Sequence, residues 1–447
     1  MRVLKFGGTS VGSAERMRHV AELITKTSEP KIIVLSAVSG TTNKLVEIGE
    51  LLSARSLEMA HLAIEKLFSE YQDLLKELLA SNEMREIGEE VINNSFSLMK
   101  NYLKYPFGKS KNNELLAQGE LLSTGLFNLY LAENGIDAQL ISALDFMHLD
   151  ENGEPSLEDI SIKLQKVLEN YPEQKLFITQ GFICLNSEGD IDNLKRGGSD
   201  YTASLIGAAL NAEEVEIWTD IDGMHNNDPR IVENTRAVQH LSFDEAAELA
   251  YFGAKILHPT SILPAQEREI PVRLKNTMNP EAPGTLIDNT GVTRTVKAVA
   301  AKDGITAIKI KSSRMLLAHG FLLKVFQIFD SFKTSIDLIT TSEIAVSLTV
   351  DDTSHLDDIV LELEKLGSVE VDPEQTIICL VGNFIMENGE VVNNLFNALE
   401  KMPVRMISLG GSKNNISVLL PAAYKQQALK QINDVVFGLK VMEIEKD

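Results

Sequence analysis

The chain has 447 residues, which corresponds to about three domains at roughly 150 residues each. Hydrophobic residues make up 44% and charged residues 24% of the sequence, a composition that excludes a disordered tail and a fibrous protein. The 42 Lys and Arg residues against 64 Asp and Glu residues give a net charge of −22. Such a chain repels phosphate backbones overall, which argues against a nucleic-acid partner, although a local basic pocket can still bind an anionic substrate.

The two cysteines, Cys184 and Cys379, lie far apart in the sequence, and no metal-ligand spacing surrounds either of them. Two isolated cysteines suit a reducing compartment, and we expect both to be small apolar packing residues. The sequence has no run of 18 apolar residues, so we expect no membrane contact. Lys5 and two glycines interrupt the first apolar stretch, unlike a secretion signal. The expected location is therefore the cytoplasm.

The first half of the chain alternates apolar runs with helical stretches. A strand at 2–6, a glycine turn and a helix at about 14–26 open the sequence. Further apolar runs predict buried parallel strands at 31–37, 176–180 and 215–219. This order predicts an α/β fold with a mostly parallel sheet sandwiched by helices.

The stretch from about 45 to 103 differs from its surroundings because it is rich in Leu, Glu, Lys and Met and lacks proline. Its apolar residues recur at helical spacing, as at Leu67, Tyr71 and Leu78. We therefore predict a helical insertion near 45–110 within a first domain that covers 1–295.

From about residue 305 the pattern becomes βαββαβ, and the same order recurs from about 377. This repeat predicts two ferredoxin-like modules of roughly 70 residues each, at 300–373 and 374–447, with strands that the two modules can exchange. The predicted strands are 305–310, 335–339, 344–350 and 369–371 in the first module and 377–381, 404–408, 416–420 and 441–444 in the second.

The segment Lys5-Phe6-Gly7-Gly8-Thr9-Ser10 ends the first strand in a glycine turn that carries a lysine. Ligands of open α/β sheets bind beyond the carboxyl ends of the strands, and phosphates suit glycine turns at helix N-termini. A phosphate site and a plain strand-to-helix turn both fit this segment. No G-x-G-x-x-G follows a strand, so a dinucleotide fold has no support.

Several further segments combine residue types that bind charged ligands. Arg196-Gly197-Gly198-Ser199-Asp200 precedes an apolar helix, which Ser199 or Asp200 could instead merely cap. Glu120 stands at the predicted start of a helix, where an acid could simply compensate the helix dipole. Lys255 interrupts an apolar stretch, where an unpaired charge is costly, and Asp228-Pro229-Arg230 also fits an ordinary turn.

Taken together, these segments resemble the aspartokinase family, within the wider amino-acid kinase fold. The C-terminal pair is similar to the ACT regulatory modules of that family, and the resemblance covers essentially the whole chain. The matching motifs are 5–11, 36–43, 119–120, 179–182, 196–201, 218–220, 228–230 and 252–259.

The resemblance implies transfer of the ATP γ-phosphoryl group to the side-chain carboxylate of L-aspartate, giving 4-phospho-L-aspartate on the pathway to lysine, threonine and methionine. It implies that Lys5 and Lys255 neutralise the phosphates and that Asp200 orients Lys5. Arg196 would bind the aspartate carboxylate and Glu120 its ammonium group. Other implied contacts are Ser39, Thr42, Phe182 and Ser199 for aspartate, and Gly7, Gly8, Thr219, Asp220, His225 and Arg230 for ATP.

His225 stands where many relatives carry tyrosine, so an exposed loop histidine is the alternative there. Mg²⁺ is expected to arrive with ATP, held mainly by phosphates and water, with no protein ligand assigned.

The resemblance to lysine-sensitive members implies that an amino-acid inhibitor, lysine first among them, binds between ACT modules of a homo-oligomer. Asp337 would accept its ammonium group, with an exposed strand-end carboxylate as the alternative. Leu317 and Ala318 stand where such relatives often carry histidine and serine, which leaves the effector's identity open. The other implied effector contacts are Met315, Gly320, Phe321, Leu322, Thr341 and Ser342.

Two alternatives remain on the sequence alone. One is another amino-acid kinase, acting on glutamate, N-acetylglutamate or a nucleotide, against which the family motifs and the ACT pair argue. The other is a catalytically silent amino-acid sensor, against which the intact Lys5, Arg196 and Asp200 argue.

Overall fold

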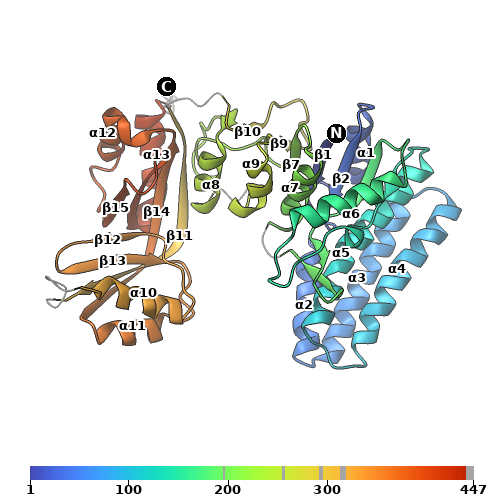
Figure 1. Cartoon of the computed structure of the whole chain (residues 1–447), viewed down its shortest axis with the longest axis horizontal. Helices are drawn as coiled ribbons and strands as arrows, with labels where there is room; N and C mark the ends of the chain where they lie inside the picture. The colour runs from blue at the N-terminus through green and yellow to red at the C-terminus, as the bar shows by residue number, and fades with distance from the viewer. Residues whose placement is uncertain (195–196, 254–256, 291–294, 313–318, 439–447) are drawn as a thin grey trace, which may run out of the picture. The chain divides into compact units, whose positions relative to one another are not determined.

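The computed structural model describes residues 1–194, 197–253, 257–290, 295–312 and 319–438 (Figure 1). The chain divides into two compact units. Unit 1 comprises Met1–Met224 and Leu257–Asn289, and unit 2 comprises His225–Ile256 and Thr290–Asp447. The chain first passes from unit 1 to unit 2 between Met224 and His225.

Unit 1 is built on a sheet in the order β3-β4-β2-β1-β7-β9-β10, in which every neighbouring pair except β9 and β10 is parallel. All five residues of both β2 and β4 are buried, as expected for parallel strands covered on both faces. The predicted α/β class is confirmed. The strands are β1 (Arg2–Phe6), β2 (Lys31–Leu35), β3 (Gln139–Leu140), β4 (Leu176–Gln180), β7 (Val215–Thr219), β9 (Val272–Asn276) and β10 (Thr285–Ile287), with a separate hairpin of β5 (Ile183–Leu185) and β6 (Ile191–Asn193).

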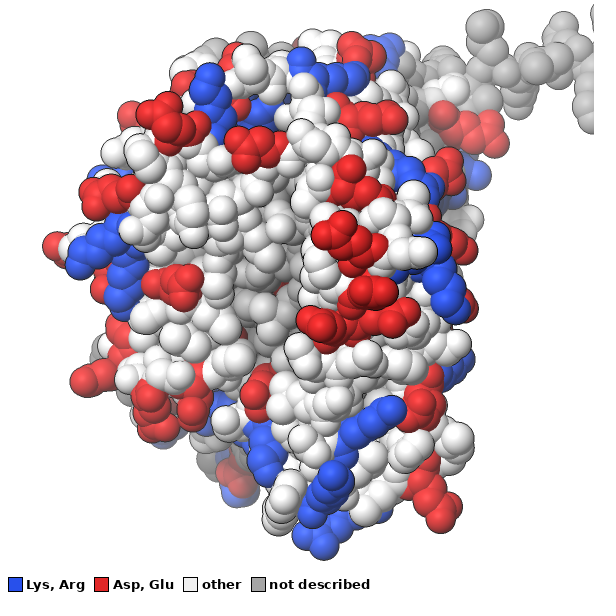
Figure 2. Space-filling model, turned by 90° about the vertical axis from the view of Figure 1, so that its right-hand side faces the viewer, with Lys and Arg blue, Asp and Glu red and all other residues white. Residues whose placement is uncertain are grey.

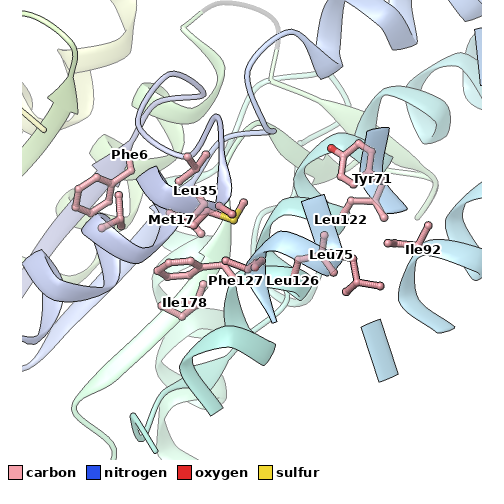
Figure 3. Close-up of a cluster of buried hydrophobic side chains, with 14 of the residues drawn as sticks. Phe6, Met17, Leu35, Tyr71, Leu75, Ile92, Leu122, Leu126, Phe127 and Ile178 are labelled. Carbon is pink, nitrogen blue, oxygen red and sulfur yellow. The ribbon is translucent and has the colours of Figure 1, made fainter. Parts of the chain in front are cut away.

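The predicted helical insertion forms long helices that pack against one another and against the sheet (Figure 1). Figure 3 shows the core that joins them: Phe6 and Ile178 of the sheet lie near Phe127 of α5, and Tyr71 and Ile92 continue the cluster into α3 and α4. The helices of unit 1 are α1 (Ala14–Thr25), α2 (Thr41–Ser53), α3 (Leu57–Leu78), α4 (Asn82–Tyr102), α5 (Lys109–Glu133), α6 (Leu157–Glu169), α7 (Gly198–Leu210) and α9 (Leu263–Glu267), with short 3-10 helices at Ala143–Asp145 and Pro259–Ile262.

Unit 2 contains an antiparallel sheet in the order β12-β13-β11-β14-β16-β15. Helices α10 and α11 cover one hydrophobic core and α12 and α13 cover another, as the predicted pair of ferredoxin-like modules requires. The elements are β8 (His240–Leu241), α8 (Phe243–Tyr251), β11 (Val296–Lys311), α10 (Phe321–Ser331), β12 (Ile339–Thr341), β13 (Ala345–Val350), α11 (Leu356–Glu364), β14 (Ser368–Gly382), α12 (Gly389–Ala398), β15 (Met406–Leu409), β16 (Asn415–Pro421) and α13 (Lys425–Val436), with 3-10 helices at Ile385–Glu387 and Ala422–Tyr424.

Two details of unit 2 differ from the prediction. The strands expected at 369–371 and 377–381 are one continuous strand, β14, because both parts pair with the long strand β11. The boundary expected between 373 and 374 therefore falls inside a strand that the two cores share. The strand expected at 335–339 forms regular pairing with β13 only from Ile339 onward, and the one expected at 441–444 lies outside the described residues.

By its contacts, the segment 225–256 belongs to unit 2. Val232 packs in the core beneath α12 and α13. Asn227 donates a hydrogen bond to the Leu429 carbonyl oxygen of α13 at 2.9 Å, and Asn226 is bound to Asn433 at 3.4 Å.

Among the described residues, no helix combines the length and apolar character that crossing a bilayer requires. Figure 2 shows the face of the protein that lies at the right of Figure 1. Acidic side chains are spread over this face, with basic side chains among them, around a central hollow.

Candidate active site

The carboxyl ends of four neighbouring parallel strands, β4, β2, β1 and β7, meet at one edge of the unit 1 sheet. The segments that follow these strands include the residues that the sequence singled out: Gly7 and Gly8 after β1, Ser39 after β2, and Phe182 after β4. The sheet topology thus gathers residues that are far apart in the sequence, as expected for a ligand site in this class of fold.

A pocket of about 400 Å³ lies at this edge. It contains Ser39, Thr42, Glu120, Phe182 and Ser199, which are all of the predicted aspartate contacts except Arg196, a residue outside the described ones. The full lining is Gly8, Thr9, Ser36, Ala37, Val38, Ser39, Gly40, Thr42, Asn43, Glu120, Phe182, Gly198 and Ser199.

Lys5 and Asp200 form an ion pair beside this pocket, with 2.7 Å between Nζ and Oδ1. Their side chains are 12% and 15% exposed, so the pair is shielded but can still be reached by a ligand. Asp200 lies in the first turn of α7, whose N-cap is Gly197 without a side-chain hydrogen bond. The alternative that Asp200 or Ser199 merely caps this helix is therefore wrong.

Glycines allow the close approach of these loops. A Cβ atom on Gly8 would lie 2.9 Å from the Ala37 carbonyl oxygen, so a side chain there would force apart the loops that follow β1 and β2. Gly197 has φ +71°, in the left-handed region that favours glycine, and a Cβ atom there would meet Ser261 at 2.6 Å. The N–H of Gly7 already donates to the Trp218 carbonyl oxygen at 3.1 Å. The Gly7 N–H is therefore engaged within the protein, which corrects the prediction that Gly7 offers this group to ATP.

Glu120 is buried to 3% exposure, and its position corrects a prediction. It lies in the middle of α5, which begins at Lys109, so its acid does not compensate a helix N-terminus. Its Oε1 accepts a hydrogen bond from the Ala37 N–H at 3.1 Å, whereas Oε2 has no hydrogen-bond partner among the described residues. Burial raises the pKa of Glu120 to about 8, although the Ala37 hydrogen bond acts in the opposite direction.

The hydroxyl groups around Glu120 form a polar wall. The Ser36 hydroxyl donates to Ser199 Oγ at 2.9 Å, which joins the segment after β2 to the start of α7. Phe182 has φ +67°, a strained value for a non-glycine residue, and its N–H donates to Thr202 Oγ1 at 2.9 Å. Sequence reasoning missed Ser36, Thr9 and Asn43 as lining residues. Their place in the motifs that follow β1 and β2 was the available signal.

The predicted nucleotide contacts divide between the two units. Thr219 is the last residue of β7 in unit 1, and its hydroxyl donates to Oδ1 of the next residue, Asp220, at 3.2 Å. Arg230 lies in unit 2 and donates to both carboxylate oxygens of Asp228, at 2.9 and 2.8 Å. The hydrogen bonds from Arg230 lower the pKa of Asp228 below its usual value, and the Arg230 N–H closes the turn on Asp228 at 2.9 Å.

His225 also lies in unit 2. It is half-buried rather than fully exposed, with 2.8 Å between its Nδ1 and Thr235 Oγ1. Lys255, which the resemblance assigns to the phosphates, lies outside the described residues.

The predicted effector contacts lie in unit 2. The Asp337 side chain is only 1% exposed, and its Oδ1 accepts hydrogen bonds from Tyr251 Oη at 2.8 Å and from Lys302 Nζ at 2.7 Å. The alternative of an exposed strand-end carboxylate is therefore wrong, and Tyr251 and Lys302 are partners that sequence reasoning missed.

The other predicted effector residues differ in exposure. Phe321 packs in the core beneath α10, whereas Leu322 is exposed. Gly320 precedes α10 with φ +78°, and Ser342 closes a turn with Ala345 beside the exposed end of β12. Met315 lies outside the described residues.

Comparison with known proteins agrees with this arrangement. Residues 1–276 match the amino acid kinase family, and residues 378–436 match an ACT domain. Lysine-sensitive aspartokinase 3 of Escherichia coli is 34% identical over 97% of this chain and 99% of that protein. Aspartokinase 1 of Arabidopsis thaliana chloroplasts is 37% identical over 97% of this chain and 80% of that protein.

Solved structures extend the comparison to three dimensions. The crystal structure of E. coli aspartokinase III in complex with aspartate and ADP is similar at a TM-score of 0.85 and 34% identity, over 98% of this chain and 100% of that one. The complex of the same enzyme with lysine and aspartate gives a TM-score of 0.81 over 98% and 99%. On this evidence the chain belongs to the aspartokinase family and is an aspartate kinase with an ACT regulatory half.

Proposed function

We propose that the pocket of unit 1 binds L-aspartate and directs its side-chain carboxylate to the γ-phosphoryl group of ATP, giving 4-phospho-L-aspartate. The observation that carries this proposal is the Lys5–Asp200 ion pair beside a pocket with a buried acid and several hydroxyl groups. The related E. coli enzyme was crystallised with aspartate and ADP, which supports the same pair of ligands here.

The chemistry needs no general base. The aspartate side chain has an ordinary pKa near ~3.9 and is already ionised at neutral pH. The obstacle is repulsion between this carboxylate and the phosphates, so catalysis consists of positioning and neutralisation of negative charge. Lys5 supplies the positive charge at the β- and γ-phosphates, and Asp200 holds its ammonium group in place from 2.7 Å.

Recognition of aspartate requires one positive and one negative partner. Arg196 pairs with the α-carboxylate, for which a guanidinium group offers two parallel hydrogen bonds. Glu120 accepts the α-ammonium group through Oε2, which is buried and has no hydrogen-bond partner among the described residues. The remaining aspartate contacts in this proposal are Ser39, Thr42, Phe182 and Ser199.

The ATP contacts proposed for unit 1 are the Gly8 turn, Thr219 and Asp220. The family resemblance further assigns His225, Arg230 and Lys255 to ATP. In the described part of the chain, no three His, Cys, Asp or Glu side chains are grouped to hold a metal ion. Mg²⁺ arrives with ATP, held mainly by phosphates and water, and when bound it neutralises phosphate charge.

The ACT modules respond to an amino-acid effector, for which lysine is the first candidate. Its ammonium group binds at Asp337, and the E. coli relative crystallised with lysine supports this choice. The enzyme is a cytoplasmic homo-oligomer assembled through the ACT modules. The exposed side chains of Leu322, Leu323 and Phe326 on α10 supply apolar surface for that assembly, which light scattering can detect.

A coupled assay of ADP release, with aspartate and glutamate compared side by side, tests the proposed reaction. We expect aspartate-dependent release and much weaker release with glutamate. Release that prefers glutamate would indicate another amino-acid kinase. No release with either amino acid, from a protein that still binds lysine, would indicate a silent sensor.

A further inference from the structure

Lys302 occupies a site in unit 2 that is built to bind an ammonium group. Its Nζ lies 2.7 Å from Asp337 Oδ1 and 2.8 Å from Asp351 Oδ2. The same Nζ lies 4.4 Å from the centre of the Tyr251 ring. Two carboxylates and an aromatic face are the groups that bind primary ammonium ions in proteins.

The surroundings make this a strong site. The Asp337 side chain is 1% exposed and that of Lys302 is 17% exposed, so both charges are largely removed from water. Burial alone would lower the pKa of Lys302, but Asp337 and Asp351 outweigh it and raise that pKa above its usual value. Asp337 Oδ1 serves both Lys302 and Tyr251, whereas its buried Oδ2 has no hydrogen-bond partner among the described residues.

We propose that Lys302 is a built-in competitor of the effector, because its ammonium group fills the place at Asp337 that the ammonium group of an effector would take. This inference rests on the proposed role of Asp337 as the acceptor of the effector's ammonium group. Two ammonium groups repel each other at one carboxylate, so Lys302 and the ammonium group of the effector oppose each other's binding at Asp337. Lys302 therefore sets the effector concentration that the enzyme requires.

The same exchange changes the contacts of Tyr251. This tyrosine is the last residue of α8, and it contacts both Asp337 and Lys302. Lys255, the proposed phosphate-binding residue, follows four positions later in the sequence. A change of partner at Asp337 thus changes the contacts at the end of α8.

The test measures ligand binding to the full-length protein by titration calorimetry. The variant Lys302→Met removes the ammonium group and keeps an unbranched apolar side chain. Lys309→Met is the matched control, because Lys309 lies on the same strand, β11, and pairs with the exposed Glu370 at 3.3 Å. Each protein is titrated with lysine and with norleucine, which has the same carbon chain but lacks the terminal ammonium group.

We expect Lys302→Met to bind lysine at least tenfold more tightly than the wild type, with no comparable gain for norleucine and no gain in Lys309→Met. If only Lys302→Met binds lysine, the competition between Lys302 and the effector is also supported. That outcome would contradict the proposal that lysine regulates the wild-type enzyme. An unchanged or weaker affinity for lysine overturns the inference. So does an equal gain for norleucine, because it would indicate a general loosening of the module.

Two further variants keep the test decisive. If Lys302→Met fails to fold because Asp337 and Asp351 lose their partner, the double variant Lys302→Met/Asp351→Asn removes one of the two charges and leaves the expected gain. Asp337→Asn separates the two proposals. If it weakens lysine binding while Lys302→Met changes nothing, only the competition fails. If Asp337→Asn leaves lysine binding unchanged, or neither the wild type nor Lys302→Met binds lysine, the proposed effector site fails and the competition with it.

Discussion

The ionisation of Glu120 should govern how the enzyme binds aspartate as pH changes. Burial raises the pKa of this carboxyl group to about 8, so most of the free enzyme carries a neutral Glu120 at pH 7. An ammonium group needs the ionised form. Between pH 6 and pH 7 the ionised fraction rises almost tenfold, from about 1% to about 9%, and kcat/KM for aspartate should rise by about the same factor.

The substitution Glu120→Gln tests this reasoning because it removes the charge and keeps the shape of the side chain. A charged hydrogen bond of this kind contributes about 1.5–3 kcal/mol. At about 1.4 kcal/mol per decade, kcat/KM for aspartate should fall by roughly 10- to 100-fold at pH 8 or above. The variant should also lose the rise between pH 6 and pH 7, whereas KM for ATP should change little.

Stability provides a second measurement of the same ionisation. The pKa of Glu120 in the folded protein lies above its ordinary value of 4.5. A group with a raised folded pKa contributes stability that is present below the unfolded pKa and is lost as pH rises through the folded pKa. Glu120→Gln stays neutral throughout, so its melting temperature should exceed that of the wild type increasingly from pH 5 to pH 8.5.

Steady-state kinetics from pH 6 to pH 8.5 and thermal melting over pH 5 to 8.5 measure both effects on the same two proteins. A wild-type profile that is flat between pH 6 and pH 7 would refute the raised pKa. A Glu120→Gln variant with unchanged KM for aspartate would instead refute the assignment of Glu120 to the ammonium group.

Three further changes have definite expected outcomes. Lys5→Ala should lower kcat by about 100- to 1,000-fold in a folded protein, since loss of one electrostatic group at the transition state typically costs about 2.7–4 kcal/mol; a near-normal kcat would contradict its role. Arg196→Ala should raise KM for aspartate far more than KM for ATP, and the reverse pattern in steady-state kinetics would reassign Arg196 to the nucleotide. Asn433→Ala should lower the free energy of unfolding of the regulatory half by about 1–3 kcal/mol, because the buried amides of Asn226 and Asn227 lose an acceptor; an unchanged melting profile would show that these bonds contribute little.

The sequence predicted well what depends on local pattern. The strands of unit 1 are marked by continuous apolar runs, and each of the runs at 2–6, 176–180 and 215–219 forms a strand with the expected limits. Because parallel strands end at the same edge of a sheet, the motifs that follow them could be expected to meet. The pocket that contains Ser39, Phe182 and Ser199 follows from this rule.

Features that depend on tertiary contacts were predicted less well. Glu120 was expected at the start of a helix. The helix instead continues through Gly119, whose missing side chain allows α5 to pack against Ala37. The Glu120 carboxyl group is thereby buried at the pocket, and no local pattern in the sequence indicates that it is buried.

The contacts of the segment 225–256 are a second such feature. The segment follows a strand of unit 1 in the sequence, and it falls within residues 1–276, which match the amino acid kinase family. Its association with α13 depends on hydrogen bonds between residues about 200 positions apart, such as Asn227 and Leu429. Its polar composition gave no hint of this, because buried asparagines resemble loop asparagines until their partners are known.

Both halves of the protein hold a lysine against an aspartate at 2.7 Å, but the surroundings fit the two pairs to different tasks. Lys5 and Asp200 keep 12% and 15% exposure at the rim of a pocket, so a phosphate can approach Lys5 while Asp200 still holds it. Lys302 and Asp337 are packed beneath a tyrosine, with one carboxylate oxygen left unmatched among the described residues. A buried charge that loses its partner is costly. Asp337 therefore releases Lys302 at low cost only when another ammonium group takes the place of the Lys302 ammonium group. In our proposals, the same contact therefore serves as a fixed catalytic support in unit 1 and as an exchangeable one in unit 2.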